Sequence, residues 1–260
     1  MSAIVDILSR LRSLGAGAVD LLLPGTCMAC RAEEATTENL CQACNLRLLA
    51  LVALPYCRRC GAGLSGGLPA AESCRACPST LPRYDCVIRL GPYEDPLRII
   101  VRQLKYHRQE ALRGHLGRLL GAAVAARCEV PLDLVLSVPM HWRRRLARGY
   151  DHALVLAKAV AGELDLPVGN ELLRVRHTPP QAHLTRTRRI ENVRGAFDVR
   201  RGAALAGAKV LLVDDVTTTG ATANEAARGL LRAGASSVTL AAVAKAEPPA
   251  AYSERRTDHV

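Results

Sequence analysis

Aromatic side chains are scarce in this chain of 260 residues, which has one Trp, one Phe and six Tyr. Proteins that hold single-stranded nucleic acid in an extended form stack successive bases on several aromatic faces, so this composition argues against such a platform. Wholesale disorder is excluded too, because 49% of the residues are hydrophobic and 23% are charged. At roughly 150 residues per domain, the length predicts one or two domains.

Long apolar runs are also lacking, since none approaches the ~20 residues that a membrane-spanning helix needs. A secretory signal is not expected, because Arg10 and Arg12 interrupt the first apolar stretch. Within residues 1–20 we expect an amphipathic helix, which could touch a membrane but more simply packs on its own protein. Its apolar positions have helical spacing: Ile4, Ile7, Leu8, Leu11 and Leu14. We expect a cytoplasmic protein without a membrane span, in which thiols stay reduced.

Two common nucleotide-binding loops are missing from the chain. It has no G-x-x-x-x-G-K-[ST] loop for a nucleoside triphosphate and no G-x-G-x-x-G turn for a dinucleotide. A phosphate site in this protein must therefore be built in another way.

Cysteine, in contrast, is abundant and concentrated. Eight of the ten cysteines form four C-x-x-C pairs: Cys27 and Cys30, Cys41 and Cys44, Cys57 and Cys60, Cys74 and Cys77. Two such pairs complete the tetrahedral thiolate site that Zn²⁺ accepts, with no position left for a catalytic water. We expect two structural zinc sites, most simply from pairs that follow one another in sequence. Crossed pairing, iron–sulfur binding and redox activity remain alternatives.

The segment that carries these pairs, residues 21–80, offers no strand or helix long enough to build a core of its own. Something other than hydrophobic burial is expected to hold it together. Cys86 and Cys128 lie outside it in apolar surroundings, and we interpret them as ordinary buried cysteines.

From Pro82 onward, apolar runs alternate with helical patterns, which predicts an α/β fold with a parallel sheet covered on both faces. Strands are expected at 84–90, 132–139, 171–176, 208–216 and 237–244, and helices at 95–106, 109–127, 151–163 and 221–233. Residues 177–194 are expected to form a polar, Arg-rich loop. The α/β domain then spans residues 82–246, and residues 247–260 form a loose tail.

The richest chemistry follows the clearest strand, in the segment from Val210 to Thr222. Two adjacent carboxylates, Asp214 and Asp215, are followed by three threonines and Gly220 before the next helix. Hydroxyls and backbone N–H groups at a helix start form an anion cradle at the end of a parallel strand. Carboxylates beside that cradle disfavour a bare phosphate, but they suit vicinal hydroxyls and Mg²⁺. A sugar phosphate satisfies both requirements.

A second anion site is predicted where residues 132–139 lead into the next helix. Four arginines occupy six positions there, and Arg side chains donate paired hydrogen bonds to phosphate oxygens: Arg143, Arg144, Arg145 and Arg148. The alternative is a solvated basic turn. Most of the formal net charge of +11 belongs to the chain after residue 80, because residues 1–80 hold seven basic and six acidic residues.

The segment from Val210 to Thr222 resembles the 5-phosphoribosyl 1-pyrophosphate (PRPP) motif of type I phosphoribosyltransferases. The resemblance implies that Asp214 and Asp215 hold the ribose hydroxyls, and that the following residues wrap the 5-phosphate: Thr217, Thr218, Thr219, Gly220, Ala221 and Thr222. It further implies a pyrophosphate loop at His141, Arg143, Arg148 and Gly149, in which Arg148 joins the two aspartates as a catalytic residue.

The resemblance also places a mobile loop over the reaction, carrying Gln181, Leu184, Arg188, Arg189 and Asn192. Such a loop excludes water from the electron-poor ribose carbon. A disordered surface segment is the alternative interpretation.

Taken together, VPMHWRRRLARGYDHA, QLKYH and TPPQAHLTRTRRIENVRGAF resemble the ComF family, which includes GntX-like proteins and joins a double zinc ribbon to a phosphoribosyltransferase-like domain. One departure is that Tyr150 and His152 stand where Phe and Gln-like residues are expected. The family is associated with DNA uptake, competence and the use of DNA as a nutrient.

Two functions therefore compete. The first is a phosphoribosyltransferase that uses PRPP and Mg²⁺ and serves DNA uptake and competence or nucleotide salvage, with catalysis mainly by positioning and charge stabilisation. The second is a non-catalytic, PRPP-sensing adaptor that contacts single-stranded DNA or DNA-uptake and recombination proteins. The sequence identifies neither the acceptor substrate nor the oligomeric state.

Overall fold

The computed structural model describes residues 26–32, 35, 39–64, 74, 76–78, 80, 82–104, 110–148, 150–179 and 184–246. The expected amino-terminal helix within residues 1–20 and the expected tail at 247–260 lie outside the described residues.

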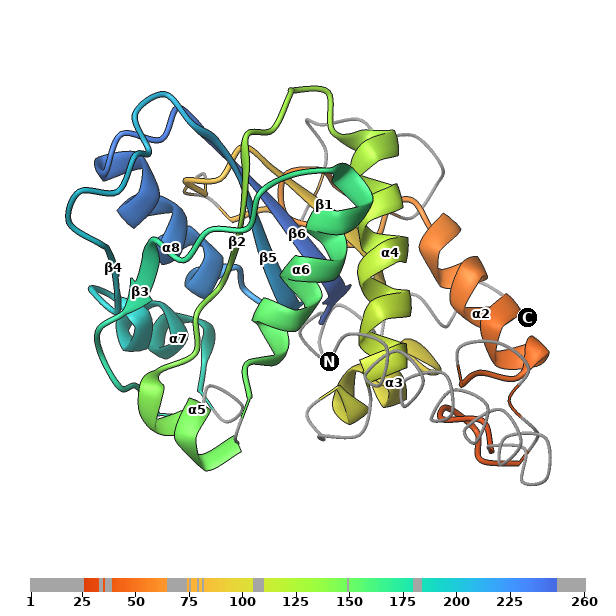
Figure 1. The fold of residues 1–260 in the computed structure, drawn as a ribbon. Helices are drawn as coiled ribbons and strands as arrows, with labels where there is room; N and C mark the ends of the chain where they lie inside the picture. The colour runs from red at the N-terminus through yellow and green to blue at the C-terminus, as the bar shows by residue number, and fades with distance from the viewer. Residues whose placement is uncertain are drawn as a thin grey trace, which may run out of the picture.

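A four-stranded parallel sheet forms the centre of the molecule (Figure 1). Its strands, in spatial order, are β1 (Cys86–Pro92), β6 (Ser237–Lys245), β5 (Lys209–Thr217) and β2 (Leu134–Ser137). Every neighbouring pair is parallel. The expectation of a parallel α/β sheet is confirmed, and these four strands lie where near-continuous apolar runs predicted them.

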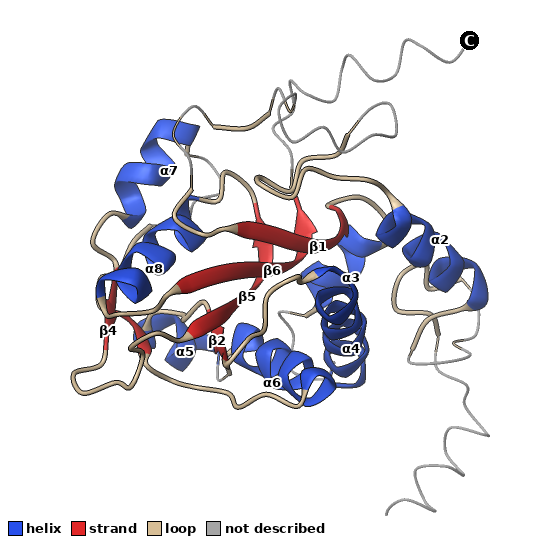
Figure 2. Ribbon diagram, turned by 90° about the horizontal axis from the view of Figure 1, so that it is seen from above, coloured by secondary structure: helices blue, strands red, loops and turns tan. Residues whose placement is uncertain are grey.

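Helices cover both faces of this sheet (Figure 2). On one face lie α3 (Leu97–Gln103), α4 (Glu110–Arg127) and α6 (His152–Leu164), and on the other lies α8 (Ala221–Arg232). Successive side chains of a strand point to opposite faces. Accordingly, Leu211 and Val213 of β5 join the core beneath α4 and α6, whereas Val210 and Leu212 join the core beneath α8.

The expected strand at 171–176 is present but does not join the parallel sheet. It is β3 (Leu172–Arg174), which pairs antiparallel with β4 (Phe197–Val199) in a separate two-stranded sheet. The sequence analysis did not predict β4, because three residues carry too little periodicity to be recognised.

Two expected loops contain short helices. Residues 177–194 were predicted to be a loop, but they include α7 (Arg186–Val193), whose first turn is capped where Thr185 Oγ1 accepts a hydrogen bond from Arg188 N at 3.4 Å. Val193 at its end is 1% exposed. The Arg-rich turn after β2 likewise forms α5 (Trp142–Arg148). The sequence analysis did not predict α5, because its repeated arginines leave no apolar stripe at helical spacing.

The cysteine-rich segment contains α2 (Gln42–Ala53), a helix that the sequence analysis did not predict. Cys41 caps it, since its Sγ accepts a hydrogen bond from Cys44 N at 3.4 Å. The helix builds no separate core. Leu48 is fully buried in the same apolar cluster as α4, and a Cβ at Gly91 of β1 would lie 3.1 Å from Leu51 Cβ. The part of the segment that carries the first cysteine cluster and α2 is therefore buried together with the core of the α/β domain.

Candidate phosphate site at the carboxyl edge of the sheet

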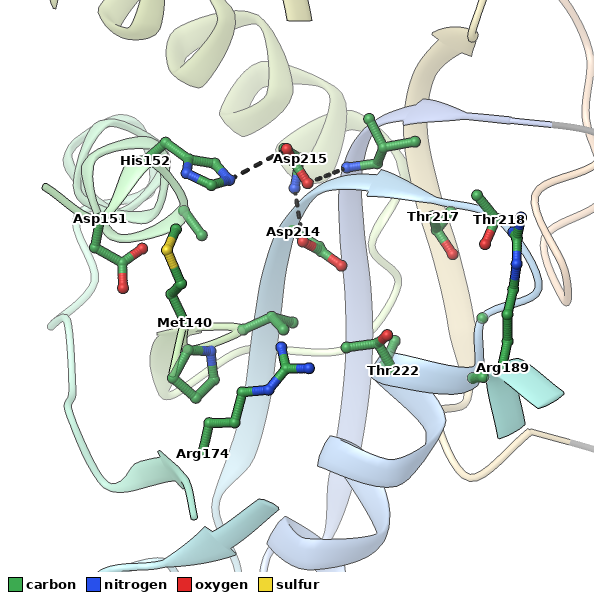
Figure 3. Close-up of a pocket in the computed structure, with 17 residues that line it drawn as sticks. Met140, Asp151, His152, Arg174, Arg189, Asp214, Asp215, Thr217, Thr218 and Thr222 are labelled. Carbon is green, nitrogen blue, oxygen red and sulfur yellow. Dashed lines mark hydrogen bonds and ion pairs between the residues drawn. The ribbon is translucent and has the colours of Figure 1, made fainter. Parts of the chain in front are cut away.

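A cavity of about 320 Å³ lies at the carboxyl ends of β5 and β2, the edge at which open α/β sheets bind ligands (Figure 3). Its lining comes from five parts of the chain: residues 138–140 after β2, residues 151–153 at the start of α6, Arg174 of β3, Arg189 of α7, and most of residues 214–223. Except for Thr219, every residue of the segment from Asp214 to Thr222 lines it. The tertiary structure thus surrounds the predicted PRPP motif with side chains from the rest of the domain.

The loop after β5 turns into α8 at Gly220, which has a φ of +74°. A side chain at this position would be strained, and a Cβ would lie 2.6 Å from the Tyr84 hydroxyl. Ala221 N donates to Thr219 Oγ1 at 3.3 Å, but no side chain caps the helix at Gly220. The positive end of the α8 dipole therefore faces a cavity bordered by Thr218 and Thr222, which suits an anion.

The two aspartates lie at the floor of the cavity and are tied to the backbone. Asp214 Oδ1 accepts a hydrogen bond from Asp215 N at 2.9 Å, and Asp215 Oδ1 accepts one from Val216 N at 2.7 Å. Burial raises the pKa of Asp214 well above its usual range, and the neighbouring Asp215 raises it further. Asp214 and Asp215 repel each other when both are ionised, and a cation or hydroxyl donors would relieve this repulsion.

His152 was not predicted as a site residue, yet it lines the cavity and contacts the second aspartate. Its Nε2 lies 3.2 Å from Asp215 Oδ2. The preceding residue, Asp151, caps α6 by accepting a hydrogen bond from Leu154 N at 3.3 Å. The sequence feature that could have pointed to His152 is its position directly after Asp151, the helix cap that follows the Arg-rich turn.

Arg174 is a second unpredicted residue of the cavity. It comes from β3, and its Nη2 donates to Thr178 Oγ1 at 2.5 Å while its guanidinium lies 5.3 Å from the centre of the Phe197 ring. Its charge acts to lower the pKa of Asp214 against the effect of burial. Figure 3 shows the side chain directed toward the end of β5. The sequence did not reveal its role, because the position of β3 depends on antiparallel pairing with β4, which lies beyond α7 in the chain.

The predicted mobile loop contributes Arg189, which lines the cavity and donates from Nε to the Leu184 carbonyl oxygen at 2.9 Å. Arg188 is exposed, and Asn192 Nδ2 donates to the Pro179 carbonyl oxygen at 3.1 Å, so in the described part of the chain neither lines the cavity. Gln181 lies outside the described residues.

The predicted pyrophosphate loop reaches the cavity through its first residues, Val138 to Met140. His141 is 5% exposed, and its Nδ1 accepts a hydrogen bond from Arg143 N at 3.3 Å. Among the described residues, neither His141 nor Arg143 lines the cavity. Gly149 and the side chain of Arg148 lie outside the described part of the structure.

The eight paired cysteines form two clusters, and in each cluster the sulfur atoms all lie within 4.8 Å of one another. The first cluster is Cys27, Cys30, Cys41 and Cys44, and the second is Cys57, Cys60, Cys74 and Cys77. The structure thus assembles the sequential pairing, not the crossed one. Sulfur pairs at 3.8, 3.6 and 3.6 Å match the edge of about 3.8 Å that a tetrahedron with Zn–S distances of about 2.3 Å requires.

The thiols of the first cluster have divergent pKa values. Burial acts to raise the pKa of Cys27, but backbone hydrogen bonds at Cys30 and Cys41 outweigh it and lower the pKa to about 6. Burial and the neighbouring thiols raise the pKa of Cys44 instead. A divalent cation resolves this competition by letting all four sulfurs be thiolates, so the donor set fits two zinc sites.

Among the described residues, no helix is long and apolar enough to cross a membrane.

Comparison with known proteins agrees with this geometry. Residues 18–78 match the family model of the double zinc ribbon domain, and residues 151–259 match that of the phosphoribosyl transferase domain. The chain is 31% identical over 228 residues to competence protein F of Haemophilus influenzae, an alignment that covers 85% of this chain and 96% of that protein. The chain belongs to the ComF family.

A further ComF-family relative is the DNA utilization protein YhgH of Salmonella typhi, 34% identical over 224 residues that cover 84% of this chain and 96% of that one. Among solved structures, the glutamine PRPP amidotransferase of B. subtilis is 22% identical over 54% of this chain and 30% of that chain, with a TM-score of 0.37. An adenine phosphoribosyltransferase of Trypanosoma brucei is 16% identical, and the match covers 65% of this chain and 74% of that chain, also with a TM-score of 0.37.

These findings confirm the expected architecture, a double zinc ribbon followed by a phosphoribosyltransferase-like α/β domain.

Proposed function

We propose that this ComF-family protein binds PRPP together with Mg²⁺ at the carboxyl edge of its sheet and transfers the phosphoribosyl group to an acceptor nucleophile. The observation that carries the proposal is the cavity in which Asp214 and Asp215 lie beside the amino end of α8. One part of that cavity suits hydroxyl donors, and the other suits a phosphate.

Each part of the sugar phosphate has a counterpart in the chain. The carboxylates of Asp214 and Asp215 would accept hydrogen bonds from the ribose hydroxyls, and the backbone and hydroxyls of Thr218 to Thr222 would hold the 5-phosphate. Arg174 and Arg189 reach the same cavity and supply positive charge for the pyrophosphate. Catalysis would then come from positioning and from stabilising the departing pyrophosphate.

The oxygen donors of Asp214 and Asp215 fit the preference of Mg²⁺ for carboxylate ligands. When bound, Mg²⁺ would neutralise charge on the pyrophosphate.

Calorimetric titration with PRPP and Mg²⁺ tests binding, and the release of pyrophosphate with a panel of bases and amines tests transfer. Replacing both aspartates, Asp214→Asn with Asp215→Asn, should abolish binding, whereas Asp198→Asn, at the exposed position of β4, should leave it unchanged. Unchanged affinity in the double variant would reject the site. Binding without turnover for any acceptor would favour the adaptor function.

A second candidate, the adaptor that binds single-stranded DNA, is favoured by the surface of α5. Trp142 is the only tryptophan of the chain and is 59% exposed, and the Arg143 guanidinium lies 5.3 Å from the centre of its ring. Arg145 is exposed on the same helix. One exposed aromatic face with flanking cations can stack a base and contact phosphates. The names of two relatives, competence protein F and DNA utilization protein YhgH, point the same way.

Titration of labelled single-stranded DNA at several salt concentrations tests this second candidate. Trp142→Ala should weaken binding by about tenfold if a base stacks on the ring. The matched variant Leu146→Ala removes a side chain that is 73% exposed on the same helix and should have little effect. Lack of binding at low salt would exclude the adaptor's DNA contact.

A further inference from the structure

The side chain of Lys245, the last residue of β6, lies between two parts of the molecule that are far apart in the sequence. It is one of only four lysines and is 7% exposed. Its Nζ donates a hydrogen bond to the backbone carbonyl oxygen of Thr218, in the loop between β5 and α8. Its aliphatic stem lies against Gly61, where a Cβ would approach Lys245 Cδ to 3.6 Å.

The hydrogen bond to Thr218 orients a peptide of the candidate phosphate loop. The C=O and N–H of a trans peptide point in opposite directions, so holding the Thr218 carbonyl toward Lys245 turns the N–H of Thr219 away from it. Thr218 lines the cavity and Lys245 does not. The ammonium therefore fixes the orientation of the peptide between Thr218, which lines the cavity, and Thr219, with the Thr219 N–H directed away from Lys245.

The main chain leaves little freedom for this arrangement. Lys245 is the register partner of Thr217 across β5 and β6, and Ala246 N donates to the Thr217 carbonyl oxygen at 2.9 Å. The root of the lysine side chain is thus fixed beside the start of the loop, and only its outer part can shift.

Gly61 belongs to the turn that carries Cys57 and Cys60 of the second cysteine cluster. Its N donates to the Cys57 carbonyl oxygen at 2.7 Å, and its own carbonyl oxygen accepts a hydrogen bond from Arg89 Nε at 2.7 Å. Gly61 has a φ of +79°, and a Cβ there would lie 3.2 Å from Val87 Cγ1. The turn is therefore seated tightly on β1 and forms the wall against which the lysine stem rests.

We propose that Lys245 is a positioning residue for the phosphate loop and that the second cysteine cluster supports PRPP binding through it. A zinc ion that holds the turn at Cys57 and Cys60 would hold Gly61, and Gly61 would keep the lysine ammonium against the Thr218 carbonyl. The proposal rests on the proposed function, because PRPP is the ligand whose affinity reports the loop geometry.

The first test removes the ammonium and keeps the stem, with Lys245→Met. Hydrogen exchange of peptides that cover residues 217–222, measured without ligand, should become faster, and PRPP affinity should fall by about tenfold, the order of a lost hydrogen bond to a charged group. Lys245→Arg keeps a cationic donor and should restore part of both. The matched control is Lys209→Met, at the opposite end of β5, which should change neither.

The second test disturbs the wall while keeping all eight thiols, with Gly61→Ala. Its zinc content should remain at two per chain, while exchange at residues 217–222 becomes faster. Combining Gly61→Ala with Lys245→Met should add little to Lys245→Met alone, because both changes act through one contact. The double replacement Cys57→Ser with Cys60→Ser should accelerate exchange in the same peptides.

Normal exchange and normal affinity in a folded Lys245→Met chain would overturn the positioning role. Unchanged exchange at residues 217–222 after loss of the second cluster would overturn the coupling. A wild-type chain that binds no PRPP would defeat the proposed function instead, and the exchange comparison, made without ligand, would still decide the role of Lys245.

Discussion

His152 Nε2 lies 3.2 Å from Asp215 Oδ2, so a helix on one face of the sheet reaches over the strand end and contacts the second carboxylate of the candidate site. His152 is 9% exposed and belongs to the first turn of α6, which Asp151 caps. A carboxylate held in this way is oriented before a ligand arrives, which lowers the cost of ordering it on binding.

From this contact we predict that His152→Ala weakens PRPP binding by about tenfold, the upper range for one hydrogen bond. His152→Gln retains a donor and should keep most of the affinity. Calorimetry in the presence of Mg²⁺ measures both. Equal affinity of His152→Ala and the wild-type chain would show that Asp215 needs no such support.

Replacing Gly220 by Ala should distort the phosphate loop. The residue has a φ of +74°, and a Cβ would meet the Tyr84 hydroxyl at 2.6 Å. We expect a loss of about 1–2 kcal/mol in the free energy of unfolding, together with weaker PRPP binding. Thermal melts and calorimetry measure these effects.

Two companion variants separate the causes of that loss. Adding Tyr84→Phe removes the close contact and should recover part of the stability, but not the cost of the positive φ. Gly162→Ala, in α6, where an added Cβ would meet nothing within 4 Å beyond its chain neighbours and the backbone of its own helix, should stabilise the protein slightly. A Gly220→Ala chain as stable as the wild type would contradict the strain argument.

Leu48→Ala in α2 should destabilise the whole molecule and not merely the cysteine-rich segment. Leu48 is fully buried in the cluster that also contains residues of α3, α4 and α6, so its truncation should cost about 2–5 kcal/mol. Chemical denaturation should remain a single transition. The neighbouring Leu49 is 45% exposed, and Leu49→Ala should cost much less. Two separate transitions in the wild-type protein would argue against a shared core.

Metal analysis of the purified protein should find two zinc ions per chain. Cys57→Ser with Cys60→Ser should lose one ion, and Cys27→Ser with Cys30→Ser should lose the other. Cys27→Ser with Cys30→Ser should lower the melting temperature more than the other double variant. The reason is that Cys27 and its cluster are packed into the main core, whereas the cluster of Cys57 and Cys60 packs in a small core of its own. Much less than two zinc ions in the wild-type chain would reject the two-site assignment.

The local patterns of the sequence were sufficient to predict the α/β fold class and the motifs that carry the chemistry. Continuous apolar runs predicted the four strands of the parallel sheet, because a strand covered on both faces has no polar side to interrupt it. Four C-x-x-C pairs predicted two four-sulfur clusters, and the segment from Asp214 to Thr222 predicted a ligand site, most of which lines the cavity. In both cases the residues that carry the chemistry lie close together in the sequence.

The tertiary structure alone decided which residues from distant parts of the sequence surround the candidate site. Arg174 enters the cavity because β3 pairs with a three-residue strand some 25 positions later, and His152 meets Asp215 because α6 packs across the end of β5. Lys245 contacts both Thr218 and Gly61, which are far apart in the sequence. Such pairings are set by the packing of whole elements, which no local periodicity encodes, and they supply the surroundings that make the phosphate loop a site.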